Sequence, residues 1–323
     1  MLLALAAVPV VISAVLGLMA PVVGRRLPPA VAVKFLTPAA LAAALTTGFC
    51  LAVLAFNALS QLPVVAHLGH WALAGDPDDG TPSPVTGVIL AIVVVGLLIT
   101  AVHYLVNAAA DAIRFGSACR QLNQSRRRLV VLDDSVADAF AVPGRRRRIV
   151  ITSAMLAALN ADERAVLIAH ERSHLEHHHQ LFVQAANLAA QANPLLLGVA
   201  AVVRTLTERW ADEDAAVAVE DRNLVARTVA KAALARTASI SATRARVMAA
   251  SGIATTGVPE RVRALTHPQP RPQRRLAVAL AGLAVAGLLA SVSIAHATER
   301  KFEHAQRADS VSMIDSHREF DGH

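Results

Sequence analysis

The sequence predicts a mainly α-helical membrane protein that also carries one mostly helical domain in water. Of its 323 residues, 54% are hydrophobic and 17% are charged, whereas about 25% of the residues of an ordinary soluble domain are charged. Four apolar segments of about 20 residues each are long enough to cross a hydrocarbon core of roughly 30 Å. Because charged residues concentrate between the third and the fourth segment, we expect the domain to be inserted there.

The N-terminal membrane region covers residues 1–107 and contains three predicted transmembrane helices, at about 2–23, 37–60 and 86–107. The first helix has no basic residues before it, and Arg25 and Arg26 follow it, so we expect a retained helix and not a cleaved signal peptide. A fourth transmembrane helix is expected over 276–296. The short tail 297–323 is expected to be extracellular and disordered.

The distribution of Lys and Arg predicts the orientation, because these residues mark the cytoplasmic side of short loops. The loop 24–36 carries three basic residues, whereas the loop 61–85 carries none and has three aspartates. The segment 108–275 begins and ends with arginines and holds 24 Lys and Arg against 15 Asp and Glu. We therefore expect a multi-pass protein of the plasma membrane, with both termini outside and the 108–275 domain in the cytoplasm.

Two arginine clusters, Arg126–Arg128 and Arg145–Arg148, resemble the basic patches of nucleic-acid-binding proteins. No aromatic residues are interleaved with these arginines, as a base-stacking surface would need. Basic residues beside membrane helices commonly meet anionic lipid head groups, at about 1 kcal/mol each. We therefore expect the lipid bilayer, and not nucleic acid, to be their partner.

Within the 108–275 domain, apolar periodicity that is poor in Gly and Pro predicts several helices over 153–235. Two short β-branched runs, Val130–Leu132 and Ile149–Ile151, predict a small hairpin or a pair of strands. The stretch 252–275 is rich in Gly, Pro, Thr and Arg, which predicts a linker to the last span.

A capping box of Asn160 and Glu163 predicts a helix that begins near residue 161 and runs to about 190. This helix contains His170-Glu171-Arg172-Ser173-His174, an H-E-x-x-H pattern. On a helix the two histidines share one face and can bind one Zn²⁺, with Glu171 beside them. Zinc lowers the pKa of its bound water toward about 7. A neighbouring carboxylate can accept the proton that this water loses and later donate it to the leaving amine of a cleaved peptide.

The pattern therefore predicts a metallopeptidase site with His170 and His174 as metal ligands and Glu171 as the catalytic base. The alternative is a solvated histidine-rich helix face, which the neighbouring His177, His178 and His179 favour.

A catalytic zinc site needs a third protein ligand and an open position for water. Downstream, Glu208 and Asp212 lie one helical turn apart. We assign Glu208 as the third ligand and Asp212 as the acceptor that orients a ligating imidazole. The competing assignments for the third ligand are Glu213, Asp214 and Glu220. Without a metal, the same acidic patch would pair with Arg204 or Arg209.

These motifs, together with Ala139-Phe-Ala-Val-Pro-Gly144 and Ile149-Val-Ile-Thr-Ser153, resemble those of gluzincin-type integral membrane peptidases. The resemblance extends to two branches, the BlaR/MecR-like membrane metallopeptidases and the HtpX-type proteases of protein quality control. Three predicted spans before the domain and one after it resemble the BlaR/MecR arrangement. The resemblance implies a gluzincin-type metalloprotease domain that holds Zn²⁺ through His170, His174 and Glu208, with Glu171 as general base. It also implies signal transduction by cleavage of a DNA-binding repressor of the BlaI/MecI type.

The chain departs from the BlaR/MecR pattern in two places. After the fourth predicted span only 27 residues follow, with no S-x-x-K acylation motif, so we do not expect direct β-lactam sensing. Arg172 stands where the family commonly has an apolar residue. The sequence therefore leaves three alternative functions: cleavage of a repressor, HtpX-like degradation of misfolded membrane proteins, and a non-catalytic signalling scaffold. The complete set of one base and three ligands argues against the scaffold.

Overall fold

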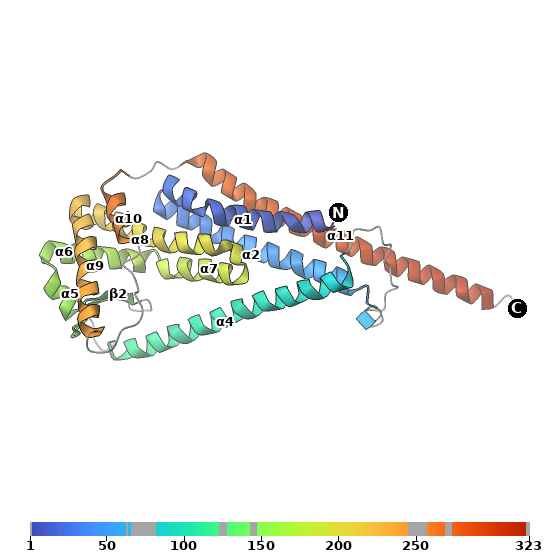
Figure 1. Ribbon diagram of the computed structural model, residues 1–323, viewed down its shortest axis with the longest axis horizontal. Helices are drawn as coiled ribbons and strands as arrows, with labels where there is room; N and C mark the ends of the chain where they lie inside the picture. The colour runs from blue at the N-terminus through green and yellow to red at the C-terminus, as the bar shows by residue number, and fades with distance from the viewer. Residues whose placement is uncertain are drawn as a thin grey trace.

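The computed structural model describes residues 2–62, 64–65, 82–122, 128–142, 147–244, 257–268 and 273–320. These residues form an elongated bundle of helices with a small sheet near one end (Figure 1). Most of the 61–85 loop and two arginines of each basic cluster, Arg126 and Arg127, and Arg145 and Arg146, lie outside the described residues.

The four predicted membrane helices are confirmed as helices long and apolar enough to cross a membrane. They are α1 (Leu2–Arg26), α2 (Pro29–Leu59), α4 (Pro84–Leu122) and α11 (Arg274–Phe320). Helix α2 packs against α1, α4 and α11, so it lies at the centre of this group. The tail differs from the expected disorder, because α11 continues to Phe320. Residues 297–320 contain neither Gly nor Pro, the two residues that most disfavour a helix interior.

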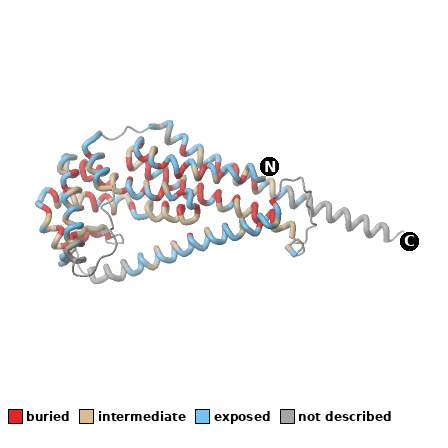
Figure 2. Tube along the Cα trace, viewed as in Figure 1, coloured by how far each residue is buried: buried red, intermediate tan, exposed pale blue. Residues whose placement is uncertain are grey.

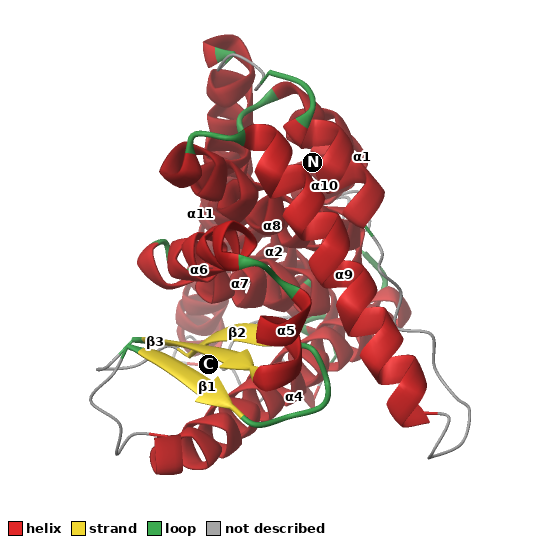
Figure 3. Cartoon of the chain, turned by 90° about the vertical axis from the view of Figure 1, so that its left-hand side faces the viewer, coloured by secondary structure: helices red, strands yellow, loops and turns green. Residues whose placement is uncertain are grey.

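The sheet consists of β1 (Leu129–Leu132), β2 (Ala139–Val142) and β3 (Arg148–Thr152), in the order β1-β3-β2. The two predicted strand segments do pair, but β1 and β3 are parallel and do not form a hairpin. The unpredicted strand β2 pairs antiparallel with β3 and forms one edge of the sheet. All five residues of the central strand β3 are buried, and α5 and α6 pack against the sheet (Figure 3).

The remaining elements are α5 (Ser153–Ala158), α6 (Ala161–Glu176), α7 (His179–Ala192), the 3₁₀ turn η1 (Pro194–Leu196), α8 (Leu197–Val219), α9 (Arg222–Arg244) and α10 (Val258–Leu265). The predicted capping box is present, since the side chains of Asn160 and Glu163 each accept a hydrogen bond from the other's backbone N–H. The helix does not continue to residue 190. It breaks at His178, whose φ of 53° is left-handed, and α7 then begins with His179 turned inward and only 1% exposed.

The predicted linker 252–275 contains a helix that the composition did not indicate. Helix α10 begins after Gly257, with Pro259 in its first turn, a position where proline is well tolerated. Residues 252–256 and 269–272 of this stretch lie outside the described residues.

The largest buried cluster joins the membrane helices to α7 and α8 (Figure 2). Helix α7 packs against α2 and α4, and α8 packs against α1 and α2. The cluster includes Leu16, Ala20 and Val23 of α1, Val33 and Leu36 of α2, Ala186 and Ala189 of α7, and Val199, Val203 and Leu206 of α8. The predicted cytoplasmic domain is therefore not separate from the membrane helices, because two of its helices share their core.

Candidate metal centre

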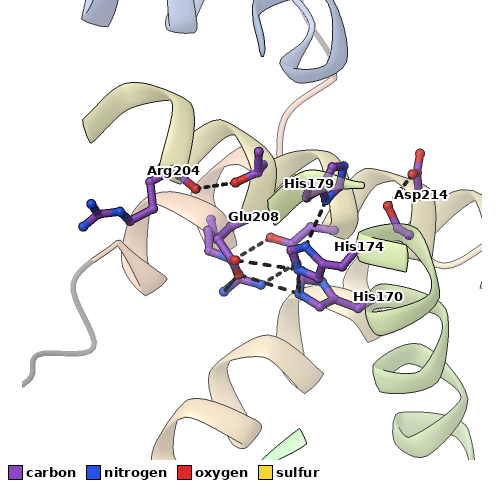
Figure 4. A network of polar contacts seen from close by, with 10 residues as sticks. His170, His174, His179, Arg204, Glu208 and Asp214 are labelled. Carbon is purple, nitrogen blue, oxygen red and sulfur yellow. Dashed lines mark hydrogen bonds and ion pairs between the residues drawn. The ribbon is translucent and has the colours of Figure 1, made fainter. Parts of the chain in front are cut away.

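Helices α6 and α8 pack side by side and bring the predicted site residues together (Figure 4). The Nε2 atoms of His170 and His174 lie 3.2 Å apart. Glu208 reaches them from α8, with Oε2 3.7 Å from Nε2 of His170 and Oε1 3.6 Å from Nε2 of His174. One ligand atom from each of the three residues lies within 4.8 Å of the other two.

This donor set fits a zinc ion. Two imidazole nitrogens and one carboxylate oxygen are a three-ligand set of catalytic zinc sites, which keep a further position for water. His170, Glu171 and Glu208 line a cleft of about 870 Å³, so the open side of the cluster faces a space that a peptide can enter.

Asp212 lies one turn after Glu208 and is only 1% exposed. Its Oδ1 is 3.0 Å from Nδ1 of His170, which leaves Nε2 of that ring directed at the other two metal-ligand candidates. A carboxylate behind a ligating imidazole fixes the ring and its tautomer in many metal sites. The structure thus brings Asp212 into contact with the imidazole of His170, on the side away from Nε2.

Arg261 of α10 is part of the same cluster, although the sequence did not point to it. It donates Nε to Oδ2 of Asp212 at 2.7 Å and Nη2 to Oδ1 at 2.6 Å, and its Nη1 lies 3.1 Å from Oε2 of Glu208. The guanidinium therefore holds both carboxylates. The pKa of Asp212, which burial alone would raise, is lowered by these hydrogen bonds from Arg261 and by the contact with His170.

Arg222, at the start of α9, fixes α10 in this position. It pairs with Glu213 of α8 through two hydrogen bonds, and it donates to the backbone carbonyls of Ala264, Leu265 and His267 at the end of α10. Because carbonyls at a helix C-terminus lack partners within the helix, this arginine both caps α10 and ties it to α8.

The competing third ligands have other partners or positions. Glu213 is bound to Arg222, Asp214 accepts from Ser173 at 2.6 Å and lies 3.1 Å from His177, and Glu220 ends α8 with a φ of 57°. The proposed basic partners of an acidic patch have other hydrogen-bond partners: Arg204 donates to the side-chain oxygen of Asn187, and Arg209 donates to the carbonyl of Gly24.

Electrostatics distinguish the two histidines. Burial lowers the pKa of His170, but hydrogen bonds with Asp212 and Glu208 outweigh it and raise that pKa to about 10. Burial and the neighbouring His170 lower the pKa of His174 to about 4. Of the two rings, His170 is therefore the one that is protonated at neutral pH without metal, and the proton on its Nε2 must leave before that atom can bind zinc.

We expect zinc binding at pH 7 to release about one proton, and zinc affinity to rise about tenfold per pH unit below the pKa of His170, because proton and metal compete for one nitrogen. Calorimetric titration of metal-free protein in buffers with different heats of ionisation measures this release. Zinc binding without proton release would show that His170 is neutral before the metal arrives.

Asp212→Asn is expected to weaken zinc binding by about 10- to 100-fold, the usual effect of losing an orienting partner of a metal ligand. Competition with a fluorescent chelator measures the affinity. Asp214→Asn is the matched control, because Asp214 lies on the same helix but contacts Ser173 and His177. Equal affinities of the two variants would contradict the orienting role.

Glu171 is 8% exposed and lines the cleft together with His170. Burial raises its pKa, which brings this carboxyl closer to the pH range where it can both take and return a proton. The cleft walls are mixed in character, and their apolar part includes Met155, Leu167, Val229, Ala232 and Ile240. The ion pair between Asp138 and Arg236, at 2.8 Å, adds charge to one wall.

A second group of rings lies behind His174. Nδ1 of His174 is 2.9 Å from Nδ1 of the buried His179. Both His179 and His177 pack on Trp210, with ring centroids 4.6 Å and 4.5 Å away. Lys34 of α2 lies over the other end of this group, its Nζ 5.0 Å from the centroid of Trp210. These contacts connect the candidate centre to the beginning of a membrane helix.

The sequence model of peptidase family M48 matches residues 100–281, more than half of the chain. Neither the curated proteins nor the solved structures contain a match to this chain. The matched range includes α6, α8 and α10, and with them all residues of the candidate centre.

Proposed function

The chain belongs to peptidase family M48, and from that premise we propose that it is a zinc-dependent endopeptidase that cleaves a protein on the cytoplasmic side of the plasma membrane. The observation that carries this proposal is the convergence of His170, His174 and Glu208 on one point beside a cleft that Glu171 also lines. In this proposal, residues 108–275 are the catalytic unit between the third and the fourth membrane helix.

Each side chain of the centre then has a task. His170, His174 and Glu208 would hold zinc, which when bound polarises a carbonyl and makes a water molecule acidic. Glu171 takes the proton of the attacking water and returns it to the leaving amine. Asp212 keeps His170 in the required orientation, and Arg261 holds Asp212 and neutralises part of the negative charge.

Strand β2 offers a way to hold a peptide. It is one of the two edge strands of the sheet, and its first residue, Ala139, lines the cleft with Asp138 before it. An extended substrate segment can add to such an edge through main-chain hydrogen bonds. This mode accepts many sequences, since the backbone provides the bonds.

The substrate follows from resemblance alone. The family match names neither of the two branches that the sequence resembles. Regulatory cleavage of a BlaI/MecI-type repressor is our first proposal, and HtpX-like degradation of misfolded membrane proteins is the second. Loss of a single repressor band on activation supports the first, whereas broad turnover of damaged membrane proteins supports the second.

The test is the metal content and peptidase activity of the detergent-purified protein. We expect about one zinc per chain, as three protein ligands imply, and cleavage of an unstructured peptide library that stops on chelation and returns with added zinc. A folded protein that binds no zinc would contradict the proposal and favour the non-catalytic scaffold.

The proposed orientation predicts the location of two reporters. A reporter fused after residue 270 is expected in the cytoplasm and one fused at residue 323 outside, because Lys and Arg concentrate in the loops assigned to the cytoplasm. Alkaline phosphatase and green fluorescent protein fusions measure the two sides. The reverse pattern would overturn the orientation.

A further inference from the structure

We propose that the hairpin formed by α7, η1 and the beginning of α8, residues 181–203, is a re-entrant membrane element covered by lipid acyl chains, and that it holds the metal centre at the level of the lipid head groups. The enzyme would then cleave membrane-anchored polypeptides within a short distance of the membrane surface. This second statement rests on the proposed function, whereas the first does not.

The tip of the hairpin lies against the middle of two membrane helices. Asn193 donates its Nδ2 to Oγ of Ser13 in α1 at 2.9 Å, and Thr100 of α4 donates to the carbonyl of Gln191 at 2.8 Å. A Cβ atom at Gly17 would lie 2.0 Å from the carbonyl oxygen of Leu195, so the two backbones touch there. Gly17 is nine residues before the basic end of α1 at Arg26, which is about 13 Å along a helix.

The composition of the hairpin matches this depth. Residues 180–203 contain no Asp, Glu, Lys or Arg. The residues of 181–203 that are exposed in the described structure are all apolar: Leu181, Pro194, Leu195, Leu197 and Ala201. Helix α7 has 14 residues, about 21 Å, too short to cross a core of roughly 30 Å and typical of a re-entrant segment.

The turn at the tip also satisfies its own polar groups, which non-helical backbone at membrane depth requires. The side chain of Asn193 accepts from the backbone N–H of Leu195, and its carbonyl accepts from that of Leu196. The hairpin lies beside α1 and α4, which are both membrane spans. We therefore infer that the exposed apolar face of the hairpin, at the same depth, is covered by the same lipid.

The position of α8 along α1 sets the depth of the metal centre. Gly24 faces Leu206, and Arg209 donates to the carbonyl of Gly24 at 3.2 Å. Glu208 therefore lies level with the last residues of α1, where Arg25 and Arg26 mark the edge of the membrane. On α2, the contact of Lys34 with Trp210 lies at the same level, and basic and aromatic side chains are typical of the head-group region.

A metal centre at the level of the head groups favours substrates that are anchored in the membrane. An extended chain advances about 3.3–3.6 Å per residue, so a segment that leaves the bilayer reaches the cleft within a few residues. Anchoring also confines that segment near the site, at an effective concentration in the millimolar range for a short tether. A protein without membrane affinity has neither advantage.

The first experiment measures the depth of the hairpin without any use of activity. In a Cys50→Ala, Cys119→Ser background, single cysteines at Leu195 and Leu197 carry a fluorophore in lipid nanodiscs of phosphatidylcholine and phosphatidylglycerol. We expect quenching by doxyl-labelled lipids and loss of quenching by iodide. Val217→Cys is the control, since it is exposed farther along the same helix, and it should behave in the opposite way.

Iodide quenching at positions 195 and 197 equal to that at 217 would show that water covers the hairpin, and the absence of quenching by both iodide and doxyl-labelled lipids would show that protein covers it. Either result would overturn the re-entrant hairpin. Ala201→Cys, exposed on the α8 arm of the hairpin, provides a second probe of the same element if the variants at 195 and 197 do not fold. A helical circular dichroism spectrum and a thermal unfolding midpoint equal to those of the parent protein identify folded variants.

The second experiment measures cleavage of one peptide that is either free or attached to a palmitoyl anchor through spacers of increasing length. With the protein in nanodiscs, we expect the short-spacer peptide to be cleaved about 100-fold faster than the free one, the lower end of the gain that tethering gives. Equal rates would overturn the membrane-proximal specificity. If neither peptide is cleaved by zinc-loaded protein, the proposed function fails, and the fluorescence result still decides the hairpin.

Discussion

Glu171→Gln is expected to lower peptide cleavage by about 10²- to 10⁴-fold, the contribution usual for a general base, and to leave the zinc content unchanged. The amide cannot take a proton from water, but it is close to the carboxylate in size and the residue is not one of the three converging ligands. The cleavage rate and the zinc per chain should be measured on the same preparation, because only the combination separates loss of the base from loss of the metal.

Glu176→Gln is the matched control. It removes a carboxylate from the same helix, but at an exposed position at its C-terminal end, so cleavage should remain at the wild-type rate. Undiminished cleavage by Glu171→Gln would refute the assignment of the base. Loss of zinc in that variant would instead make Glu171 part of the metal-holding structure.

Local patterns predicted the part of the centre that lies within single helices. His170 and His174 are four residues apart, and so are Glu208 and Asp212, so each pair shares one face by helix geometry alone. The capping box at Asn160 fixed the beginning of α6 for the same reason, since its hydrogen bonds span only three residues. The facing of α6 and α8 was inferred from the chemistry of a zinc site and not from any local signal.

Contacts between distant segments could not be predicted in this way. Arg261 is 49 residues from its partner Asp212, and its helix lies in a stretch whose Gly and Pro suggested a linker. The signals of Gly257 and Pro259 are typical of a helix start, but they contain no information about where α10 packs. The break at His178 was missed because no Gly or Pro marks it, while the inward position of His179 depends on Trp210 of α8.

Hydropathy identifies membrane segments by their length, and α7, with 14 residues, is too short to meet that criterion. Its 14 residues are interrupted by amides such as Gln184 and Asn187, which lowered its apolar character. In the structure, Gln184 is hydrogen-bonded to Tyr104 of α4. The polar residue therefore marks a contact between helices, and only the fold shows this.

Glu208→Ala is expected to weaken zinc binding by more than the roughly 100-fold that follows from loss of an orienting partner, because it removes a ligand. His174→Ala also removes one and should lose zinc as well. The loss of zinc affinity should be larger for Glu208→Ala than for His174→Ala. The guanidinium of Arg261 lies 3.1 Å from the Glu208 carboxylate, and without that carboxylate its positive charge would face the zinc position directly. Like charges repel at short range.

The double variant Glu208→Ala, Arg261→Ala separates the two contributions. If the uncompensated guanidinium contributes, zinc affinity in the double variant should exceed that of Glu208→Ala, although Arg261 supports the centre of the intact protein through Asp212. Glu220→Ala is the control at a competing third-ligand position, and it should bind zinc like the wild type. Retention of zinc by Glu208→Ala together with its loss in Glu220→Ala would move the third ligand to the end of α8 and refute the geometry of the centre.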